Sequence, residues 1–344
     1  MTSAGCTSVF YHYVRDVERT AFPGIKALSV SGFAAQLDWI QARFDVIDGE
    51  TFERAVLAGT GFDHPTALLT FDDGFVDHYE HVFPLLRARG LGGIFFLAGA
   101  MRDAPVLLNV HKTHFLLSHL GAERFTEDVA AALEGEGVNT QRERPVPEQG
   151  RRGPLRSADR EGIYRYDEAP DVRIKRILNY EAPYSVANRV LSTLFERHIG
   201  ETGAFARQLY LSPAQVREMA QGGMTFGFHT ETHPVLSRLD REAQGVELWK
   251  GPRLIGDLTG QRTVSFCYPY GFSHTYNADT LSVLAECGYS MAFNTVRRET
   301  VIGQEERYEL PRFDTRDVAT NEGSLGAGGS IGSKGSTGSA GLVQ

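Results

Sequence analysis

Apolar stretches alternate with segments of helical periodicity along the first part of the chain. Residues 7–13 are largely β-branched or aromatic and 66–71 are almost wholly apolar, as expected of strands, the second one buried on both faces. Apolar residues spaced by three or four predict helices over 32–44, with Ser31 as N-cap, and over 76–89. Further strands are predicted at 44–47, 92–97 and 224–228. Strand followed by helix, repeated in this way, is typical of a parallel α/β architecture.

The alternation stops between about residues 102 and 211, where the pattern becomes helical. Three helices are predicted there, over 106–120, 124–133 and 171–198. The last of them is interrupted at Pro183. A polar stretch over 135–159, rich in Arg, Glu, Pro and Gly, is expected to be an exposed loop. We interpret the whole segment as a long helical insertion within one barrel-like domain.

That domain is expected to span residues 1–320, since α/β barrels of this length form a single unit. The final residues, 321–344, alternate Gly with Ser and Ala. Such a composition cannot bury enough apolar surface to form a core, so we expect this tail to be disordered.

The chain of 344 residues is 42% hydrophobic and 23% charged, with a net charge of −8. This acidic balance argues against a dedicated nucleic-acid binder, and no stretch has the about 18 apolar residues of a transmembrane helix. Cys6, Cys267 and Cys287 are odd in number and far apart, so no disulfide framework is expected and a reducing compartment is favoured. Too few residues precede Cys6 for the basic and apolar parts of an export signal, which predicts a cytoplasmic protein.

Two adjacent carboxylates, Asp72 and Asp73, stand in the segment TFDDG at the end of the most apolar predicted strand. In parallel α/β folds, this end of the strands is where active sites gather. Neighbouring carboxylates repel each other unless a cation separates their roles, so that one binds a metal ion and the other stays free as a base. Capping of the next helix is the alternative, because Asp is favoured at a helix N-terminus.

A second polar segment, HTETHP, follows the predicted strand over 224–228. His229 and His233 are four residues apart and would face one metal ion if the segment formed a helical turn. Either one could instead be an ordinary polar residue with satisfied hydrogen bonds. Together with Asp73 they would complete a site of two His and one carboxylate. Such a site leaves positions for water and substrate and is typical of a catalytic metal.

A third segment, FCYPYG over 266–271, lies at the end of another strand-like run. Pro269, placed between two tyrosines and before Gly271, predicts a rigid turn near the site. By itself, such a turn indicates no particular chemistry.

The three segments, in this order and at strand ends, resemble the three motifs of the NodB-type polysaccharide deacetylases, carbohydrate esterase family four. The resemblance covers most of the chain apart from the insertion and the tail. It implies an irregular (β/α)7-type deacetylase barrel with a long helical insertion. It also implies roles for single residues: Asp72 as general base, Asp73, His229 and His233 as ligands of one divalent metal ion, and the backbone N–H of Tyr270 in an oxyanion hole.

The chain departs from the usual family pattern in two places. No histidine follows His274, although the family carries a catalytic His near its C-terminal end, and Cys267 stands where many members have an Arg. Both differences are accounted for if the chain resembles the circularly permuted branch that deacetylates biofilm glucosamine polymers. In that branch the acid His lies in an N-terminal Tyr-His strand, which corresponds here to His12. A tucked-in strand position is the alternative for His12.

Arg312 is expected to replace the missing guanidinium. It belongs to the strand-like segment 310–313 and could reach Asp72, where a charge-assisted hydrogen bond would keep the carboxylate ionised and oriented. A surface or structural ion pair is the alternative for Arg312.

Other side chains near the motifs are candidates for substrate binding. His274 follows the third motif and Tyr268 belongs to it, and we expect both to contact the substrate. Three more histidines, His111, His114 and His119, lie on the first predicted helix of the insertion. Such residues more often cap, pack or face solvent than bind a metal, although the first two share a helix face and could hold a second ion.

The resemblance implies hydrolytic removal of an N-acetyl group from an amino sugar in surface-polysaccharide biosynthesis, such as that of O-antigen or capsule. One divalent ion is expected, zinc first and iron, cobalt or nickel as alternatives, because imidazole suits all of them. A cytoplasmic enzyme would need an intracellular precursor as its substrate, and the insertion could roof the site for it. Two other functions stay open: the same chemistry on a non-sugar amide, and a catalytically inactive carbohydrate-binding relative.

Overall fold

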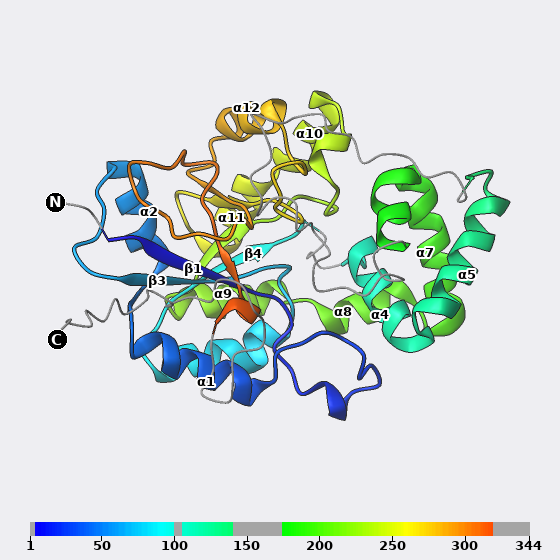
Figure 1. Ribbon diagram of the computed structural model, residues 1–344, viewed down its shortest axis with the longest axis horizontal. Coiled ribbons are helices and arrows are strands. Elements are labelled where there is room, and N and C mark those ends of the chain that lie inside the picture. The colour runs from blue at the N-terminus through cyan, green and yellow to red at the C-terminus, as the bar shows by residue number, and fades with distance from the viewer. Residues whose placement is uncertain (1–3, 100–104, 140–173, 319–344) are drawn as a thin grey trace, which may run out of the picture.

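The computed structural model describes residues 4–99, 105–139 and 174–318, in which parallel strands are surrounded by helices (Figure 1). The strands are β1 (Cys6–Tyr11), β2 (Asp45–Ile47), β3 (Thr66–Phe71), β4 (Ile94–Leu97), β5 (Thr225–Phe228), β6 (Ser265–Cys267), β7 (Ala292–Phe293) and β8 (Phe313–Asp314). The α-helices are α1 (Val30–Gln41), α2 (Gly49–Ala58), α3 (Phe83–Ala88), α4 (Asn109–Leu120), α5 (Ala122–Gly135), α7 (Tyr184–His198), α8 (Thr202–Leu209), α9 (Pro213–Gln221), α10 (Arg241–Leu248), α11 (Gly251–Thr259) and α12 (Ala278–Cys287). Short 3-10 helices are η1 (Val17–Arg19), η5 (Leu236–Arg238) and η6 (Thr315–Asp317), and π-helical segments are η2 (His78–Val82) and η4 (Ile177–Glu181).

The strands form one parallel sheet in the order β7-β6-β5-β4-β3-β1-β8, with β2 pairing against the first half of β3. The segment before β8 nearly closes this curved sheet. Leu310 forms a parallel bridge with Phe293 of β7, and a few residues later β8 pairs with β1. The strands of the main path therefore form an open barrel with helices outside it, and the predicted parallel α/β barrel is confirmed.

The central strands are covered on both faces. Every residue of β1 and β3 is buried. The ring of Phe71 stacks between those of Tyr11 and Phe95, with centroids 5.2 and 4.5 Å away. A strand without a solvent-facing side needs no polar positions, which explains the continuous apolar run of β3.

Two helical predictions differ from the structure in detail. α1 begins at Val30 rather than at residue 32, because Ser29, and not Ser31, accepts the capping hydrogen bond from the Gly32 N–H. The predicted helix over 76–89 is divided into η2 and α3, with Pro84 at the start of α3. Proline has no N–H to offer to the preceding turn, which fits the change of helix type at this point.

Helices α4, α5 and α7 lie together at one end of the molecule, on the right in Figure 1, and follow β4 in sequence. Their apolar side chains, among them Phe115, Phe125 and Leu191, continue the barrel's hydrophobic core. Pro183 separates η4 from α7. Most of the predicted loop over 135–159 and all of the predicted disordered tail over 321–344 lie outside the described residues. The bounds of the insertion stay a prediction.

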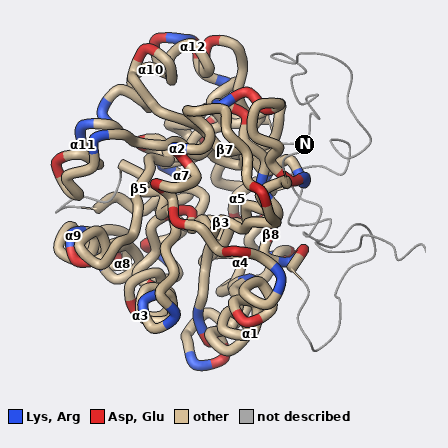
Figure 2. The backbone as a smooth tube through the Cα atoms, turned by 90° about the vertical axis from the view of Figure 1, so that its left-hand side faces the viewer, with Lys and Arg blue, Asp and Glu red and all other residues tan. Residues whose placement is uncertain are grey.

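The outer surface carries charges of both signs. Figure 2 shows basic and acidic residues interspersed along the outer helices. In the described part of the chain, no helix combines the length and apolar character needed to span a membrane.

Candidate active site

The motif residues come together because parallel strands end at the same edge of the sheet. His12 follows β1, Asp72 follows β3 and His229 follows β5. Arg312 instead precedes β8, the neighbour of β1, and its guanidinium reaches Asp72 at this edge. Four segments that are far apart in sequence therefore share one site, at the edge where ligands bind in open α/β sheets.

Asp73, His229 and His233 form a compact, buried group. The Nε2 atoms of His229 and His233 lie 3.5 and 3.6 Å from Oδ1 of Asp73. All three residues are less exposed than a tenth of their surface, and their ligand atoms lie within 4.8 Å of one another. Nδ1 of His229 donates to the carbonyl of Cys267 at 2.7 Å, so its Nε2 is left without a proton and can bind a cation.

The chemistry of this group fits a divalent metal ion. Burial lowers the pKa of His229, and it lowers the pKa of His233 to about 3, so both imidazoles are neutral near pH 7. Oδ1 of Asp73 is buried and makes no hydrogen bond with any atom of the described residues. A buried carboxylate oxygen without a donor is costly unless a cation satisfies it. Two imidazole nitrogens and one carboxylate oxygen suit zinc and related metals.

Left-handed backbone conformations position these side chains. Within the described ranges, the non-glycine residues with positive φ are Asp73 (72°), Thr230 (65°), His233 (60°) and Tyr270 (63°). Such conformations cost free energy in non-glycine residues and tend to cluster at functional sites. The segment from His229 to His233 is an irregular turn and not the helical turn that we expected. The two imidazoles converge on Asp73 because the backbone reverses at Thr230 and His233.

Glu247 of α10 holds this turn, a role that the sequence alone does not predict. Its carboxylate accepts hydrogen bonds from the backbone N–H groups of Glu231 and Thr232, at 3.0 and 2.8 Å, and from the hydroxyl of Thr232 at 2.7 Å. Within the turn, the N–H of His233 donates to Oγ1 of Thr230 at 2.9 Å. No local sequence pattern indicates that a later helix supplies this carboxylate.

Asp72 is paired with Arg312. Nη1 and Nη2 of Arg312 donate to the two carboxylate oxygens at 2.8 and 2.9 Å, and both side chains are buried. Arg312 also donates to the hydroxyl of Thr70 and to the carbonyl of Asn294, which fixes the guanidinium. Burial alone would raise the pKa of Asp72, but the charge and hydrogen bonds of Arg312 outweigh burial and hold this pKa below its ordinary value. Asp72 is thus a fixed, ionised carboxylate beside Asp73, His229 and His233, which we call the metal group.

Cys267 is part of a second group with metal-type side chains, together with Asp72 and His229. This group is less suited to a metal ion, because the oxygens of Asp72 already accept from Arg312. Burial also raises the pKa of the Cys267 thiol well above its ordinary value, which disfavours the thiolate that binds metals. Sγ of Cys267 lies 2.9 Å from Nη2 of Arg312, so this small side chain leaves room for a guanidinium that arrives from beside β8.

Removal of the guanidinium is expected to destabilise the protein strongly. In Arg312→Leu the buried carboxylate of Asp72 loses its ion-pair partner, and breaking such a pair costs about 3–5 kcal/mol. The free energy of unfolding, measured with urea at neutral pH, should fall by that amount. The double variant Asp72→Asn, Arg312→Leu should lose less, because a neutral amide needs no cation. A single Arg312→Leu variant as stable as the parent would show that the ion pair of Arg312 and Asp72 does not contribute to the free energy of unfolding.

His12 lies at the rim of the site. Its Nε2 is 3.9 Å from Oδ2 of Asp73 and its side chain is 43% exposed, so it is accessible to a substrate. Nε2 of the buried His78 donates to the backbone carbonyl of His12 at 2.9 Å. Just beyond, Arg15 pairs with the buried Asp77, with Nε 2.7 Å from Oδ2. Asp77 and His78 therefore fix the chain that carries His12. Their position shortly after the DDG motif is the sequence signal for this role.

The two predicted substrate contacts differ in their surroundings. Tyr268 is 1% exposed, its ring stacks on that of Tyr276, and its hydroxyl donates to the carbonyl of Tyr308 at 2.7 Å. The side chain of Tyr268 is therefore packed in the core, and a substrate contact of this residue stays a prediction. His274 is partly buried, and its Nε2 lies 3.3 Å from the hydroxyl of Tyr180 in η4. A substrate contact of His274 stays a prediction.

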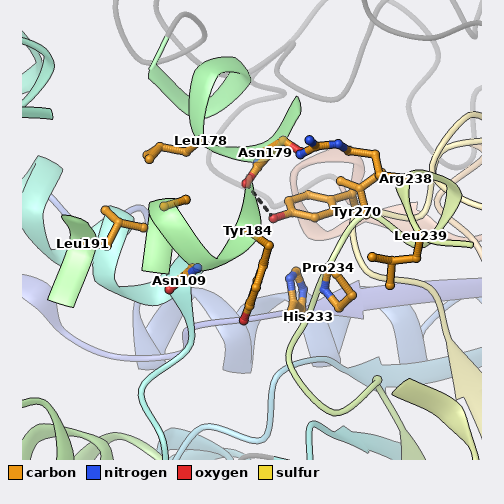
Figure 3. A pocket seen from close by; sticks show the side chains of 12 residues that line it. Asn109, Leu178, Asn179, Tyr184, Leu191, His233, Pro234, Arg238, Leu239 and Tyr270 are labelled. Atoms are coloured by element: carbon orange, nitrogen blue, oxygen red, sulfur yellow. Dashed lines mark hydrogen bonds between the residues drawn. The ribbon is translucent and has the colours of Figure 1, made fainter. Parts of the chain in front are cut away.

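A small cavity of about 150 Å³ lies between the barrel and the neighbouring helices, next to His233 (Figure 3). On the barrel side, the rings of His233 and Tyr270 have centroids 4.9 Å apart. The hydroxyl of Tyr270 donates to the side-chain oxygen of Asn179 in η4 at 3.1 Å, so the helical side reaches the third motif directly. Other lining residues are Asn109, Leu178, Tyr184, Leu191, Pro234 and Leu239.

Comparison with protein families and known sequences points in one direction. Residues 175–292 match the model of the polysaccharide deacetylase family, and this region includes His229, His233 and the YPYG turn. The protein YxkH of Bacillus subtilis (strain 168), whose name describes a polysaccharide deacetylase, is 30% identical over 119 residues. The matched part is 34% of this chain and 40% of that relative, so the chain spans less than half the length of the relative.

Solved structures share the fold. The Streptococcus pyogenes deacetylase PplD in complex with acetate has 16% sequence identity and a TM-score of 0.53, over 91% of this chain and 93% of that one. IcaB from Ammonifex degensii has 18% identity and a TM-score of 0.52, over 93% and 94% of the two chains. At these identities, the likeness shows the barrel architecture. Residues 175–292 are thus similar in sequence to the polysaccharide deacetylase family, and the fold of the chain is similar to that of these solved structures.

Proposed function

We propose that this protein is a metal-dependent deacetylase that hydrolyses the N-acetyl group of an amino sugar in surface-polysaccharide biosynthesis, such as that of O-antigen or capsule. The observation that carries the proposal is the buried group of Asp73, His229 and His233 directly beside the ionised Asp72. A metal site with a free carboxylate next to it suits hydrolysis of an amide. A carbohydrate-binding relative without activity has no need of that second carboxylate.

Asp73, His229 and His233 would hold one divalent ion. Zinc is our first choice, and iron, cobalt and nickel are the alternatives, because imidazole and carboxylate ligands suit all four. When bound, such an ion supplies Lewis-acid polarisation of the acetamide carbonyl and lowers the pKa of water.

Two side chains beside the proposed metal position carry out the proton transfers, Asp72 as acceptor and His12 as donor. Asp72, kept ionised by Arg312, accepts a proton from the water that attacks the acetamide carbon. The backbone N–H of Tyr270, in a left-handed turn beside His233, would stabilise the negative charge on oxygen. His12, at the exposed rim, donates a proton to the sugar nitrogen as the C–N bond breaks. The products are acetate and a free amine.

We infer further that the substrate is a short precursor rather than a long polymer. The cavity next to His233 is lined by residues of η4 and α7 as well as by the barrel, and Asn179 contacts Tyr270 across it (Figure 3). A site covered in this way suits one or a few sugar units, whereas an extended polymer needs an open groove.

The lining of the cavity favours one other function, hydrolysis of a non-sugar amide. Leu178, Leu191 and Leu239 contribute apolar surface, and Asn109 and Asn179 contribute polar groups. Sugar hydroxyls need hydrogen-bond partners when they are buried, so an apolar wall is better matched to a substrate with fewer hydroxyls.

A set of substrates separates these alternatives. The zinc-loaded protein is given a nucleotide-linked N-acetylhexosamine, a lipid-linked one, a long N-acetylated glucosamine polymer and an apolar N-acetyl amide, and acetate release is measured. We expect release from one of the short sugar precursors, and loss of this release in Asp72→Asn, which keeps the shape of the side chain. Preference for the polymer would contradict the inference that the substrate is a short precursor. Preference for the apolar amide would contradict the inference that the substrate is a sugar. Absence of acetate release from every substrate by the zinc-bound protein would contradict the proposed enzyme.

A further inference from the structure

His111 of α4 contacts the metal group from the side of the site where α4, α5 and α7 lie. Its side chain is fully buried, and its Nε2 lies 3.2 Å from Oδ2 of Asp73. Oδ2 is the other oxygen of this carboxylate, since the nitrogens of His229 and His233 face Oδ1. Among the described residues, Nε2 of His111 has no hydrogen-bond partner of regular geometry, and its 3.2 Å contact with Oδ2 of Asp73 is an ion-pair contact. Asp73 therefore meets a buried histidine that belongs to none of the three motifs.

The second nitrogen of this ring is held by Tyr210, between α8 and α9. The Tyr210 hydroxyl lies 2.6 Å from Nδ1 of His111 and accepts a hydrogen bond from the backbone N–H of Leu108 at 3.1 Å. Having accepted from Leu108, the hydroxyl can donate its single proton to Nδ1 of His111. His111 then carries its own proton on Nε2, directed at Asp73. Tyr210 and Leu108 are each 3% exposed, so water does not compete for these contacts.

We propose that His111 is a positioning residue for the metal ligand Asp73; this inference rests on the metal site proposed above. By donating from Nε2 to Oδ2, His111 holds the carboxylate so that Oδ1 faces His229 and His233. Partners that orient a metal ligand are worth about 10–100-fold in metal affinity or activity. The helices that follow β4 thus help to build the metal site as well as covering it.

The same geometry argues against the second metal ion that the spacing of His111 and His114 suggested. Nδ1 of His114 lies 3.4 Å from the hydroxyl of Tyr13, and the two imidazole centroids are 6.0 Å apart. Among the described residues, the side-chain groups that could hold a metal contain neither His111 nor His114. His111 therefore serves the site around Asp73 and not a separate one.

The test is a zinc-binding measurement on a small set of variants. Zinc affinity is measured by competition with a chromophoric chelator, and thermal unfolding of the metal-free proteins checks that each variant folds. His111→Leu should weaken zinc binding by about 10–100-fold. His111→Gln should recover most of that loss, because its amide N–H can replace the Nε2 donor. Tyr210→Phe should give a smaller loss in the same direction. His119→Leu, an exposed position of the same helix, is the matched control and should bind zinc like the parent.

The outcomes separate this inference from the proposed function. If the parent itself binds no zinc, the metal site fails, and with it the function. If the parent binds zinc and His111→Leu binds it equally well, only the role of His111 is overturned. It is also overturned if His111→Gln binds no better than His111→Leu, since the donor would then not be what matters. If His111→Leu does not fold, Tyr210→Phe decides: zinc affinity equal to that of the parent would overturn the role.

Discussion

Replacing His233 with alanine is expected to abolish tight binding of a divalent cation and, with it, any amide hydrolysis. His233 provides one of the three ligand atoms that lie within 4.8 Å of one another, and its removal leaves a site with two. The loss of affinity should exceed the about 10–100-fold that is typical of a partner that only orients a ligand. Metal content after dialysis against a weak chelator measures the effect, and Asp73→Ala should behave in the same way.

The control for this experiment is His64→Ala. His64 is an exposed histidine that pairs with Asp45, with Nε2 3.0 Å from Oδ2, and it belongs to no metal group among the described residues. This variant should keep full metal content. Full occupancy in both His233→Ala and Asp73→Ala would refute the assignment of the ligands.

His12→Ala is expected to keep its metal ion and to lose turnover by about 10²–10⁴-fold, the usual contribution of a positioned general acid. His12 is the exposed imidazole beside the metal group, whereas His229 and His233 are buried and needed as ligands. The measurement pairs metal content with kcat for acetate release. Far-UV circular dichroism and thermal unfolding check that the strand before His12 is undisturbed.

The matched variant is His274→Ala, which removes the second candidate for the acid, an imidazole just after the third motif. If His12 is the acid, His274→Ala should change KM more than kcat. A His12→Ala variant as active as the parent, together with a large fall of kcat in His274→Ala, would move the acid role to His274. That outcome would also remove the reason for likening the chain to the permuted branch of the family.

The sequence by itself determined strands β1 to β6 and the positions of the motifs. The apolar runs of β1 and β3 and the strands before the second and third motifs are local patterns, and burial on both faces of a parallel sheet produces such runs. Because parallel strands end at one edge, the order of strand and motif was enough to expect Asp72, Asp73 and His229 in one place. The same local patterns gave helix positions to within a few residues, although the cap at Ser29 rather than Ser31 shows their limit.

Only the tertiary structure decided how the site is built. Arg312 and Asp72 are 240 residues apart, and the contacts of His111 with Asp73 and of Glu247 with Thr232 likewise join separate elements. Pairings of this kind depend on how helices and strands pack, which no periodicity within one element records.

The backbone conformation of the motifs could not be predicted from the sequence for a related reason. Asp73, His233 and Tyr270 adopt left-handed conformations that are uncommon in residues other than glycine. The spacing of His229 and His233 was compatible with a helical turn, whereas the structure has an irregular turn there. Tyr268 is likewise a motif tyrosine whose burial follows from its stacking on Tyr276. Local residue chemistry thus determined which groups are available for catalysis. Long-range packing, which is strong enough to hold strained turns in place, decided which of them face the site.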